Sequence, residues 1–289
     1  MRQDPPPAEA ESDTGPPRPQ SLLLTFFGGY VLGRHVRVAT ASVLDILGRV
    51  GVSEDATRST LSRMARGGLL DRTRRGRSVY IGLTDRSREI LQDGEFRIWR
   101  MGAVNRGWDG TWTLLGFSLP ESWQRQRHAL RSRLLWAGFG ALQGGLWIAP
   151  SPVDVAPLLD GLDDADTAAH VRVFAARALP PTDAGDLVRT TWDLAAIAAR
   201  YRGFLDRWDG DGPADAPADR LARQLLLQTE WLRIVRRDPR LPAEHLRGDW
   251  PAERAQRVFR AVYTHLDPAA RAIAADVLDT IPDEETIPG

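Results

Sequence analysis

The sequence contains no cysteine, so disulfide bonds, thiolate metal ligands and cysteine nucleophiles are all excluded. Histidine is scarce as well, with five among 289 residues. No two histidines are four residues apart, the spacing that places two zinc ligands on one face of a helix. We therefore expect neither a metal site nor a cofactor.

Lysine is also absent, so all 38 basic residues are arginine. The guanidinium group is planar and carries several donors, which suits it to phosphates and to guanine edges. The 38 acidic residues balance this charge over the whole chain but not locally. Residues 21–100 hold 14 arginines against 8 acidic residues, a net charge of +6. Such a concentration beside neutral or acidic segments indicates a surface that binds phosphates.

Long apolar runs and familiar catalytic motifs are missing too. The segment Leu22–Leu32 is interrupted by two glycines and is far shorter than the run of about 20 residues that spans a bilayer. The N-terminus has no basic start followed by an apolar stretch, so we expect no secretory signal and a cytoplasmic location. The patterns G-x-S-x-G, H-E-x-x-H and Walker A do not occur. We predict that the protein is not an enzyme.

Composition divides the chain into four segments, and the expected fold class is multidomain α+β. Residues 1–20, with six prolines and four acidic residues, are predicted to be a disordered tail. Residues 21–100 are predicted to form a winged helix-turn-helix DNA-binding domain. Residues 101–182 are predicted to form a ferredoxin-like α+β domain, and residues 183–289 a helical C-terminal domain.

Local patterns predict the elements within these segments. The first domain is expected to hold helices over Ser21–Leu32, Ala41–Val50 and Glu54–Arg66, strands over Leu69–Thr73 and Ser78–Leu83, and a further helix. The second is expected to hold strands over Trp112–Leu119, within Ala141–Ala149 and over Val171–Ala175, with helices over Glu121–Ala137 and Val153–Leu162. The third is expected to hold helices over Asp186–Trp208, Arg220–Arg236, Pro251–His265 and Pro268–Leu278.

The helix predicted over Glu54–Arg66 has two distinct faces at about 100° per residue. Its narrow apolar face suits packing against the preceding helix and consists of Ala56, Thr57, Thr60, Leu61 and Met64. Its other face is rich in arginine and serine, which can bond guanine edges and phosphates in the major groove of DNA. Taken alone, this face is explained equally well as an ordinary solvated surface.

The predicted hairpin favours DNA binding. Four arginines lie within six residues around Gly76, with few acidic residues nearby, whereas a solvated surface usually mixes both signs. A wing placed along the phosphate backbone needs this bias. Helix and hairpin together predict a double-stranded DNA operator as partner. The candidate DNA-binding residues are Ser53, Arg58, Ser59, Ser62, Arg63, Arg66, Arg72, Arg74, Arg75 and Arg77.

Motifs in all three domains carry a family resemblance. The first domain has Gly51-Val52-Ser53-Glu54, Ser62-Arg63-Met64, Gly68-Leu69-Leu70 and Arg75-Gly76-Arg77-Ser78. The second has Trp108-Asp109-Gly110, Gly138-Phe139-Gly140 and Trp147-Ile148-Ala149-Pro150. The third has Trp231, Asp238-Pro239, Leu241-Pro242 and Trp250-Pro251. Over about residues 21–265 the sequence thus resembles the PaaX family of transcriptional regulators.

The resemblance implies a homodimeric repressor that releases DNA when it binds a small effector. It implies an aryl-CoA thioester such as phenylacetyl-CoA as the effector, an aromatic-acid catabolic operon as the target, and a Cas2-like central domain. The arginines of the second domain's first helix could meet a CoA phosphate, contact DNA or pair with acidic residues of the third domain. The candidate effector-binding residues are Arg127, Arg131, Trp147 and Trp231.

Two other functions stay open. A DNA-binding adaptor or architectural protein without an effector would need only the first domain, whereas the large remainder of the chain favours sensing. A nucleic-acid-processing enzyme built on the Cas2-like domain would need a metal-binding acidic residue at the end of its first strand. Ser118, Leu119 and Pro120 stand there instead, which argues against a nuclease.

Overall fold

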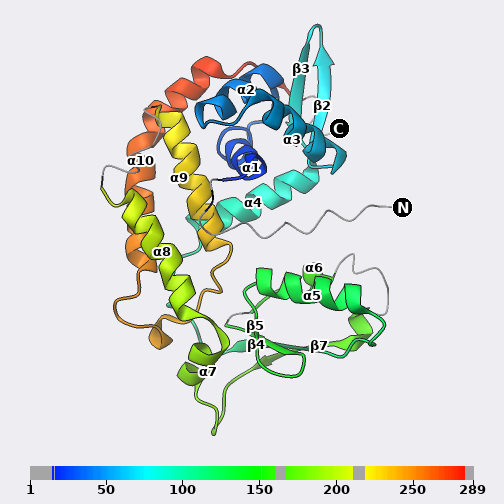
Figure 1. The fold of residues 1–289 in the computed structure, drawn as a ribbon, viewed down its shortest axis with the longest axis vertical. Helices are drawn as coiled ribbons and strands as arrows, with labels where there is room; N and C mark the ends of the chain where they lie inside the picture. The colour runs from blue at the N-terminus through cyan, green and yellow to red at the C-terminus, as the bar shows by residue number, and fades with distance from the viewer. Residues whose placement is uncertain (1–14, 16, 151, 160–166, 211–218, 284–289) are drawn as a thin grey trace. The chain divides into compact units, whose positions relative to one another are not determined.

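Figure 1 shows the fold in a computed structural model, which describes residues 15, 17–150, 152–159, 167–210 and 219–283. The predicted tail lies largely outside the described residues, although Pro19 already begins the first helix. The chain forms two compact units. The hairpin unit comprises the described residues up to Met101, Gly203–Arg233 and the described residues from Arg254, and the central unit comprises Gly102–Arg202 and Ile234–Glu253. The predicted division of the chain into consecutive domains stays a prediction.

The hairpin unit combines helices with a four-stranded sheet in the order β2-β3-β1-β8, in which all neighbours are antiparallel. Its elements are α1 (Pro19–Tyr30), β1 (Val36–Ala39), α2 (Thr40–Arg49), α3 (Glu54–Arg66), β2 (Leu70–Arg75), β3 (Ser78–Leu83), α4 (Asp85–Trp99), α9 (Arg220–Val235), α10 (Ala252–Val277) and β8 (Thr280–Pro282). The order helix, turn, helix, hairpin follows the prediction for the first domain, and α3 has the predicted bounds.

The central unit carries a second antiparallel sheet, in the order β5-β6-β4-β7. Its elements are β4 (Trp112–Phe117), α5 (Gln124–Trp136), β5 (Gly140–Ala141), β6 (Leu146–Ala149), α6 (Ala156–Leu159), the 3₁₀ helix η1 (Thr167–His170), β7 (Val171–Ala176), α7 (Ala184–Thr191), most of α8 (Leu194–Trp208) and the 3₁₀ helix η2 (Ala243–His245). The chain order strand, helix, two strands, helix, strand with this strand arrangement is ferredoxin-like, as predicted.

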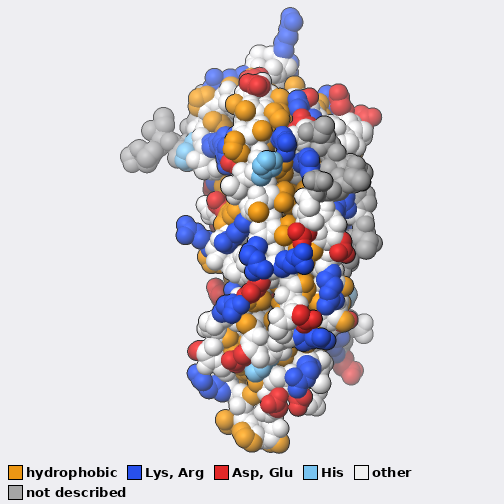
Figure 2. Space-filling view, turned by 90° about the vertical axis from the view of Figure 1, so that its left-hand side faces the viewer, with side chains coloured by type: hydrophobic (Ala, Val, Ile, Leu, Met, Phe, Trp, Pro, Cys, Tyr) orange, Lys and Arg blue, Asp and Glu red, His pale blue; other side chains and the backbone are white. Residues whose placement is uncertain are grey.

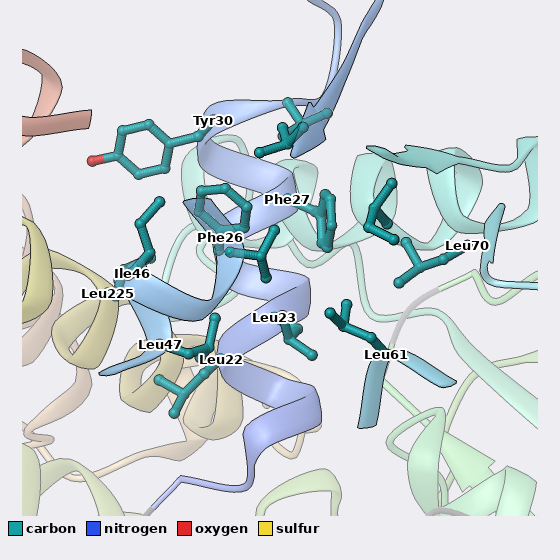
Figure 3. Close-up of a cluster of buried hydrophobic side chains, with 14 of the residues drawn as sticks. Leu22, Leu23, Phe26, Phe27, Tyr30, Ile46, Leu47, Leu61, Leu70 and Leu225 are labelled. Atoms are coloured by element: carbon teal, nitrogen blue, oxygen red, sulfur yellow. The ribbon is translucent and has the colours of Figure 1, made fainter. Parts of the chain in front are cut away.

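Helix α1 lies at the centre of the hairpin unit's core (Figure 3). Leu22, Leu23, Phe26 and Phe27 are each at most 2% exposed. At about 100° per residue these four positions lie within one arc of about 140°, and such a broad apolar face has to be covered by other parts of the chain. The surrounding side chains come from several elements and include Ile46, Leu47, Leu61, Leu70, Leu91, Leu221, Leu225, Ala270 and Ala274. The N-terminal helix and the C-terminal helices α9 and α10 therefore share one core.

Buried polar side chains join the same three helices. The Tyr30 hydroxyl donates to Gln224 Oε1, and Gln224 Nε2 donates to Asp267 Oδ1 at 3.0 Å. Thr229 Oγ1 donates to Thr25 Oγ1 at 2.8 Å. Burial raises the pKa of the Tyr30 phenol far above its usual value, so this side chain remains a neutral donor. Because buried polar groups need partners, these bonds fix how α1, α9 and α10 pair.

One helix predicted over Asp186–Trp208 is in fact two. Trp192 has an extended backbone, with φ −118° and ψ 141°, and ends α7. Asp193 then precedes α8, and its Oδ1 accepts a hydrogen bond from the Ala196 amide at 2.9 Å. This N-terminal capping bond explains the break, because an aspartate at such a position stabilises the start of a new helix.

Conversely, the two helices predicted on either side of Pro268 are one helix, α10. Pro268 removes one backbone hydrogen bond and commonly bends a helix without ending it when packing holds both halves. Figure 1 shows α10 as a bent helix. Buried Leu266 and Ala270 lie on the two sides of the proline. Within the described residues, no helix combines the length and the apolar character needed to cross a bilayer.

Replacing Leu225 with alanine should destabilise the whole hairpin unit. Because Leu225 is fully buried in the core around α1, we expect a loss of about 2–5 kcal/mol in the free energy of unfolding. Backbone amides of α1 should also exchange faster with solvent, although this helix is some two hundred residues away in sequence. Chemical denaturation and hydrogen exchange measure both effects.

The control is Leu135→Ala, because Leu135 is 61% exposed on α5. This variant should unfold like the parent chain. Unchanged exchange in α1 of the Leu225→Ala variant would show that the two helices do not share a cooperative core.

Candidate nucleic-acid interface

Both ends of helix α3 are set by its local sequence. Ser53 is the N-cap, and its Oγ accepts a hydrogen bond from the Ala56 amide at 3.3 Å. Glu54 and Asp55 occupy the first turn and arginines occupy the last, which complements the partial charges at the two helix ends. These signals explain why the predicted and observed bounds of α3 agree.

Four of the five residues predicted for the apolar face of α3 are buried, and the fifth, Ala56, is half-buried. The helix buries Thr57, Thr60, Leu61 and Met64. The two threonine hydroxyls donate to backbone carbonyls one turn earlier, Thr57 Oγ1 to Ser53 O at 3.0 Å and Thr60 Oγ1 to Ala56 O at 2.7 Å. Because these bonds satisfy the hydroxyls, the threonines can pack where apolar residues are expected.

Helix α3 and its N-cap hold the first group of predicted DNA-binding residues. Ser53, Arg58, Ser59, Arg63 and Arg66 are exposed, and Ser62 is half-buried. Arg58 NH2 lies 3.3 Å from Glu54 Oε2 in an exposed pair, and Arg63 NH2 donates to Thr60 Oγ1 at 3.2 Å. The exposed Arg58–Glu54 ion pair is worth little, and the Arg63 bond is a single hydrogen bond to a neutral hydroxyl. These side chains can therefore exchange them for contacts with a ligand at small cost.

The hairpin presents the second group of predicted DNA-binding residues. Strands β2 and β3 pair in register from Leu70 with Leu83 to Arg75 with Ser78. Gly76 begins the two-residue turn with a φ of 60°, which glycine adopts most easily and which type II′ hairpin turns require. The four arginines of the hairpin are all exposed: Arg72, Arg74, Arg75 and Arg77. Figure 2 shows basic side chains at the top of the view, where Figure 1 draws the end of the hairpin.

A buried arginine holds the base of this hairpin. Arg37 on β1 is 6% exposed, and its NH1 and NH2 donate to the two carboxylate oxygens of Asp71 at 2.6 and 3.0 Å. NH1 also donates to Thr73 Oγ1 at 2.8 Å. Burial alone would lower the pKa of the Arg37 guanidinium, but hydrogen bonds and charges from Asp71 and Asp283 raise it overall. Strand β2 is therefore fixed to β1 by a charged, bidentate contact.

Gly82 makes room for this contact. It faces Asp71 in the β2–β3 register, and an added Cβ would lie 2.6 Å from Asp71 Oδ1 and 3.0 Å from Arg37 NH1. Arg37 was not among the residues predicted from the sequence. Two features of the sequence could have pointed to this contact: Arg37 stands between two valines in a strand, and Gly82 stands within another strand.

The four predicted effector-binding residues do not all belong to one unit. Arg127, Arg131 and Trp147 belong to the central unit, and Trp231 belongs to the hairpin unit. Trp147 is 6% exposed within the core beneath α5. Trp231 is 1% exposed and stacks on Phe259, with ring centroids 4.9 Å apart and planes at 10°. Core packing accounts for both tryptophans.

Two arginines of α5 bond to the backbone of their own unit. The half-buried Arg127 donates from NH2 to Leu119 O, and Arg133 NH1 donates to Leu158 O at 3.0 Å. Arg131 is exposed on the same helix.

The end of the first strand of the central sheet lacks the acidic residue that a nuclease would need. Strand β4 ends at Phe117, and Ser118, Leu119 and Pro120 follow it. Among the described residues, no three histidine, aspartate or glutamate side chains gather as a metal site.

The fold defines a multidomain protein of mixed helix and sheet. It combines a helix-turn-helix segment and basic hairpin in one unit with a ferredoxin-like sheet in the other. The chain belongs to the PaaX family. The family models match three consecutive segments: the PaaX-like protein over residues 18–87, the PaaX protein central Cas2-like domain over 105–188, and the PaaX-like protein C-terminal domain over 192–276.

Two individual proteins extend this likeness over most of the chain. The transcriptional repressor PaaX of Escherichia coli strain K12 is 30% identical over 279 residues, which cover 93% of this chain and 87% of the repressor. The uncharacterized protein Rv0674 of Mycobacterium tuberculosis has a similar fold, with a TM-score of 0.59 and 24% identity. That likeness covers 89% of this chain and 98% of the other.

Replacing Gly82 with alanine should loosen the hairpin. The added methyl group would press on Asp71 and Arg37, so we expect a loss of about 1–3 kcal/mol in stability. Faster amide exchange in β2 and β3 should accompany it. Gly116→Ala is the matched control, because its added Cβ would meet Leu146 Cδ1 at an ordinary 3.8 Å in the other sheet. Equal effects of the two substitutions would contradict the assigned role of Gly82.

Proposed function

We propose that the protein is a sequence-specific DNA-binding transcriptional repressor. The observation that carries this proposal is the exposed arginine and serine face of α3 together with the exposed arginines of the β2–β3 hairpin. The similarity to the Escherichia coli transcriptional repressor supports it. An operator as partner is also consistent with the cytoplasmic location expected from the sequence.

The two groups of residues have different tasks in this proposal. Arg58, Ser59, Ser62 and Arg63 on α3 read base edges in the major groove, where arginine bonds guanine in a bidentate way. The hairpin arginines contact phosphates, which supply affinity without reading sequence. We further propose a homodimer, because helix-turn-helix proteins match their own two-fold symmetry to half-sites about 34–36 Å apart.

We also propose that a small molecule relieves repression. The effector class is an aryl-CoA thioester such as phenylacetyl-CoA, and the regulated genes form an aromatic-acid catabolic operon. Arg131, exposed on α5, is the candidate contact for a CoA phosphate, because its guanidinium can form charge-assisted bonds with phosphate oxygens. An adaptor or architectural protein without an effector is the alternative, and it predicts no response to any such ligand.

Two substitutions separate base reading from phosphate contact. Arg63→Ala should weaken binding to the operator by about 1–3 kcal/mol while leaving binding to unrelated DNA nearly unchanged. Arg75→Ala should weaken binding to all DNA and reduce the slope of log affinity against log salt by about 1. Titrations at several salt concentrations, with operator and scrambled duplexes, measure both.

The control is Arg189→Ala, since this exposed arginine of α7 pairs with Asp186 in the central unit. Its affinity for both duplexes should equal that of the parent chain. The winged-helix proposal fails if neither Arg63→Ala nor Arg75→Ala changes binding.

Phenylacetyl-CoA should raise the melting temperature of the protein and release it from its operator. Free CoA and free phenylacetate serve as control ligands, because each is one part of the thioester. The Arg131→Ala variant should show a smaller response to phenylacetyl-CoA than the parent chain. Thermal shift and fluorescence anisotropy of labelled operator measure these effects. Stabilisation by the free acid alone would rule out the thioester, and no response to any ligand would favour the adaptor.

A further inference from the structure

The last described strand of the chain belongs to the same sheet as the basic hairpin. Strand β8 pairs with β1 in antiparallel register, with Val36 opposite Pro282 and Val38 opposite Thr280. Strand β1 in turn pairs with β3, the second strand of the hairpin. A segment far from the hairpin in sequence, β8 at Thr280–Pro282, therefore completes the sheet from which the hairpin projects.

Asp283, directly after β8, is held in this sheet by two arginines. Its side chain is 1% exposed. Its Oδ1 accepts from Arg37 Nε at 2.9 Å, and its Oδ2 accepts from Arg88 NH2 at 2.8 Å. Its backbone amide donates to His35 O at 2.8 Å. A carboxylate this deeply buried has to be paired, so its position is tightly defined by these partners.

Arg37 connects Asp283 to the hairpin. The guanidinium bonds Asp283 through Nε, and through NH1 and NH2 it bonds Asp71 and Thr73 on β2. Thr73 immediately precedes the arginines of the turn. A continuous chain of charge-assisted hydrogen bonds thus runs from the C-terminal strand to the base of the hairpin, and every donor nitrogen of Arg37 takes part in it.

A second set of bonds fixes the link between α10 and β8. Asp279 O accepts from the Ala39 amide at 2.8 Å, and the Asp279 amide donates to Ser42 Oγ at 3.0 Å. The Tyr80 hydroxyl donates to Asp279 Oδ2 at 3.1 Å, and this bond raises the pKa of the phenol above its usual value. The segment from α10 to Asp283 is therefore bonded to β1, α2 and β3 before it reaches Arg37.

We propose that Asp283 is a positioning residue for DNA binding, which acts through Arg37 to fix the direction of the hairpin. The proposal rests on the proposed function, because it assumes that α3 and the hairpin contact one DNA duplex together. Two surfaces bind one ligand more tightly when their relative geometry is fixed beforehand, since ordering them on binding costs free energy. Because β8 follows α10 within a few residues, any displacement of the end of α10 also acts on the hairpin.

The test is a double-mutant cycle in the full chain. Asp283→Asn removes the charge but keeps the size of the side chain, and it should weaken operator binding about tenfold. In a background with Arg74→Ala, Arg75→Ala and Arg77→Ala, the same substitution should change affinity less than about twofold, because the hairpin no longer contributes contacts. A generally destabilising substitution would cost the same in both backgrounds.

Hydrogen exchange provides a second readout that needs no DNA. Amides of β2 and β3 should exchange faster in Asp283→Asn, whereas those of α1, whose core residues make no contact with Asp283, should not. Asp276→Asn is the matched control, because Asp276 is exposed on α10 and the charge change is the same. If Asp283→Asn fails to fold, Arg88→Gln removes one of the two partners of Asp283 and should shift both readouts in the same direction.

The possible outcomes distinguish the two proposals. Unchanged exchange in β2 and β3, or equal losses of affinity in both backgrounds, overturns the role of Asp283. If the parent chain binds no DNA, the proposed function fails, and faster exchange in β2 and β3 then still supports the coupling of Asp283 to the hairpin. Faster exchange together with a loss of affinity confined to the intact hairpin supports both.

Discussion

A buried guanidinium requires nearby carboxylates, because an uncompensated charge inside a protein costs several kcal/mol. Arg37 imposes this constraint on the hairpin unit. Its two counter-charges, Asp71 and Asp283, come from segments far apart in the chain, and the sheet brings them together. Gly82 is needed where the guanidinium and Asp71 lie against β3. The hairpin, β1 and the C-terminal strand are thereby joined through one side chain.

The parts of the fold that follow from local patterns were predictable from the sequence. Helix α3 begins at a serine cap and ends before two glycines, and its bounds were predicted correctly. The hairpin and the ferredoxin-like order of the central sheet follow from alternation and turn residues in the same way. The break at Trp192, the continuity of α10 through Pro268 and the pairing of β8 were not predicted. The break depends on a capping bond, and the continuity of α10 depends on packing on both sides of the proline. The pairing of β8 depends on a partner strand, β1, that is distant in sequence.

The same distinction applies to the candidate interface. A local excess of arginine over acidic residues is visible in a sequence, and nine of the ten residues predicted to bind DNA lie exposed on α3, at its N-cap or on the hairpin, with Ser62 half-buried. The predicted effector residues rested on side-chain type alone. A tryptophan is as useful in a core as in a pocket, and Trp147 and Trp231 are both buried. Arg37 and Asp283 carry no local signal, because each acquires its role only from residues that the fold places beside it.

The shared core around α1 has a consequence for how the protein is made. A ribosome releases the first hundred residues long before Leu221, Leu225, Ala270 and Ala274, which complete that core. Contacts between segments so distant in sequence form slowly and late. Until α9 and α10 are synthesised, the apolar surface of the N-terminal segment is therefore incompletely covered. Chaperones can bind this exposed apolar surface during that interval. A chain interrupted before α10 would lack the side chains of Ala270 and Ala274, which close the core around α1.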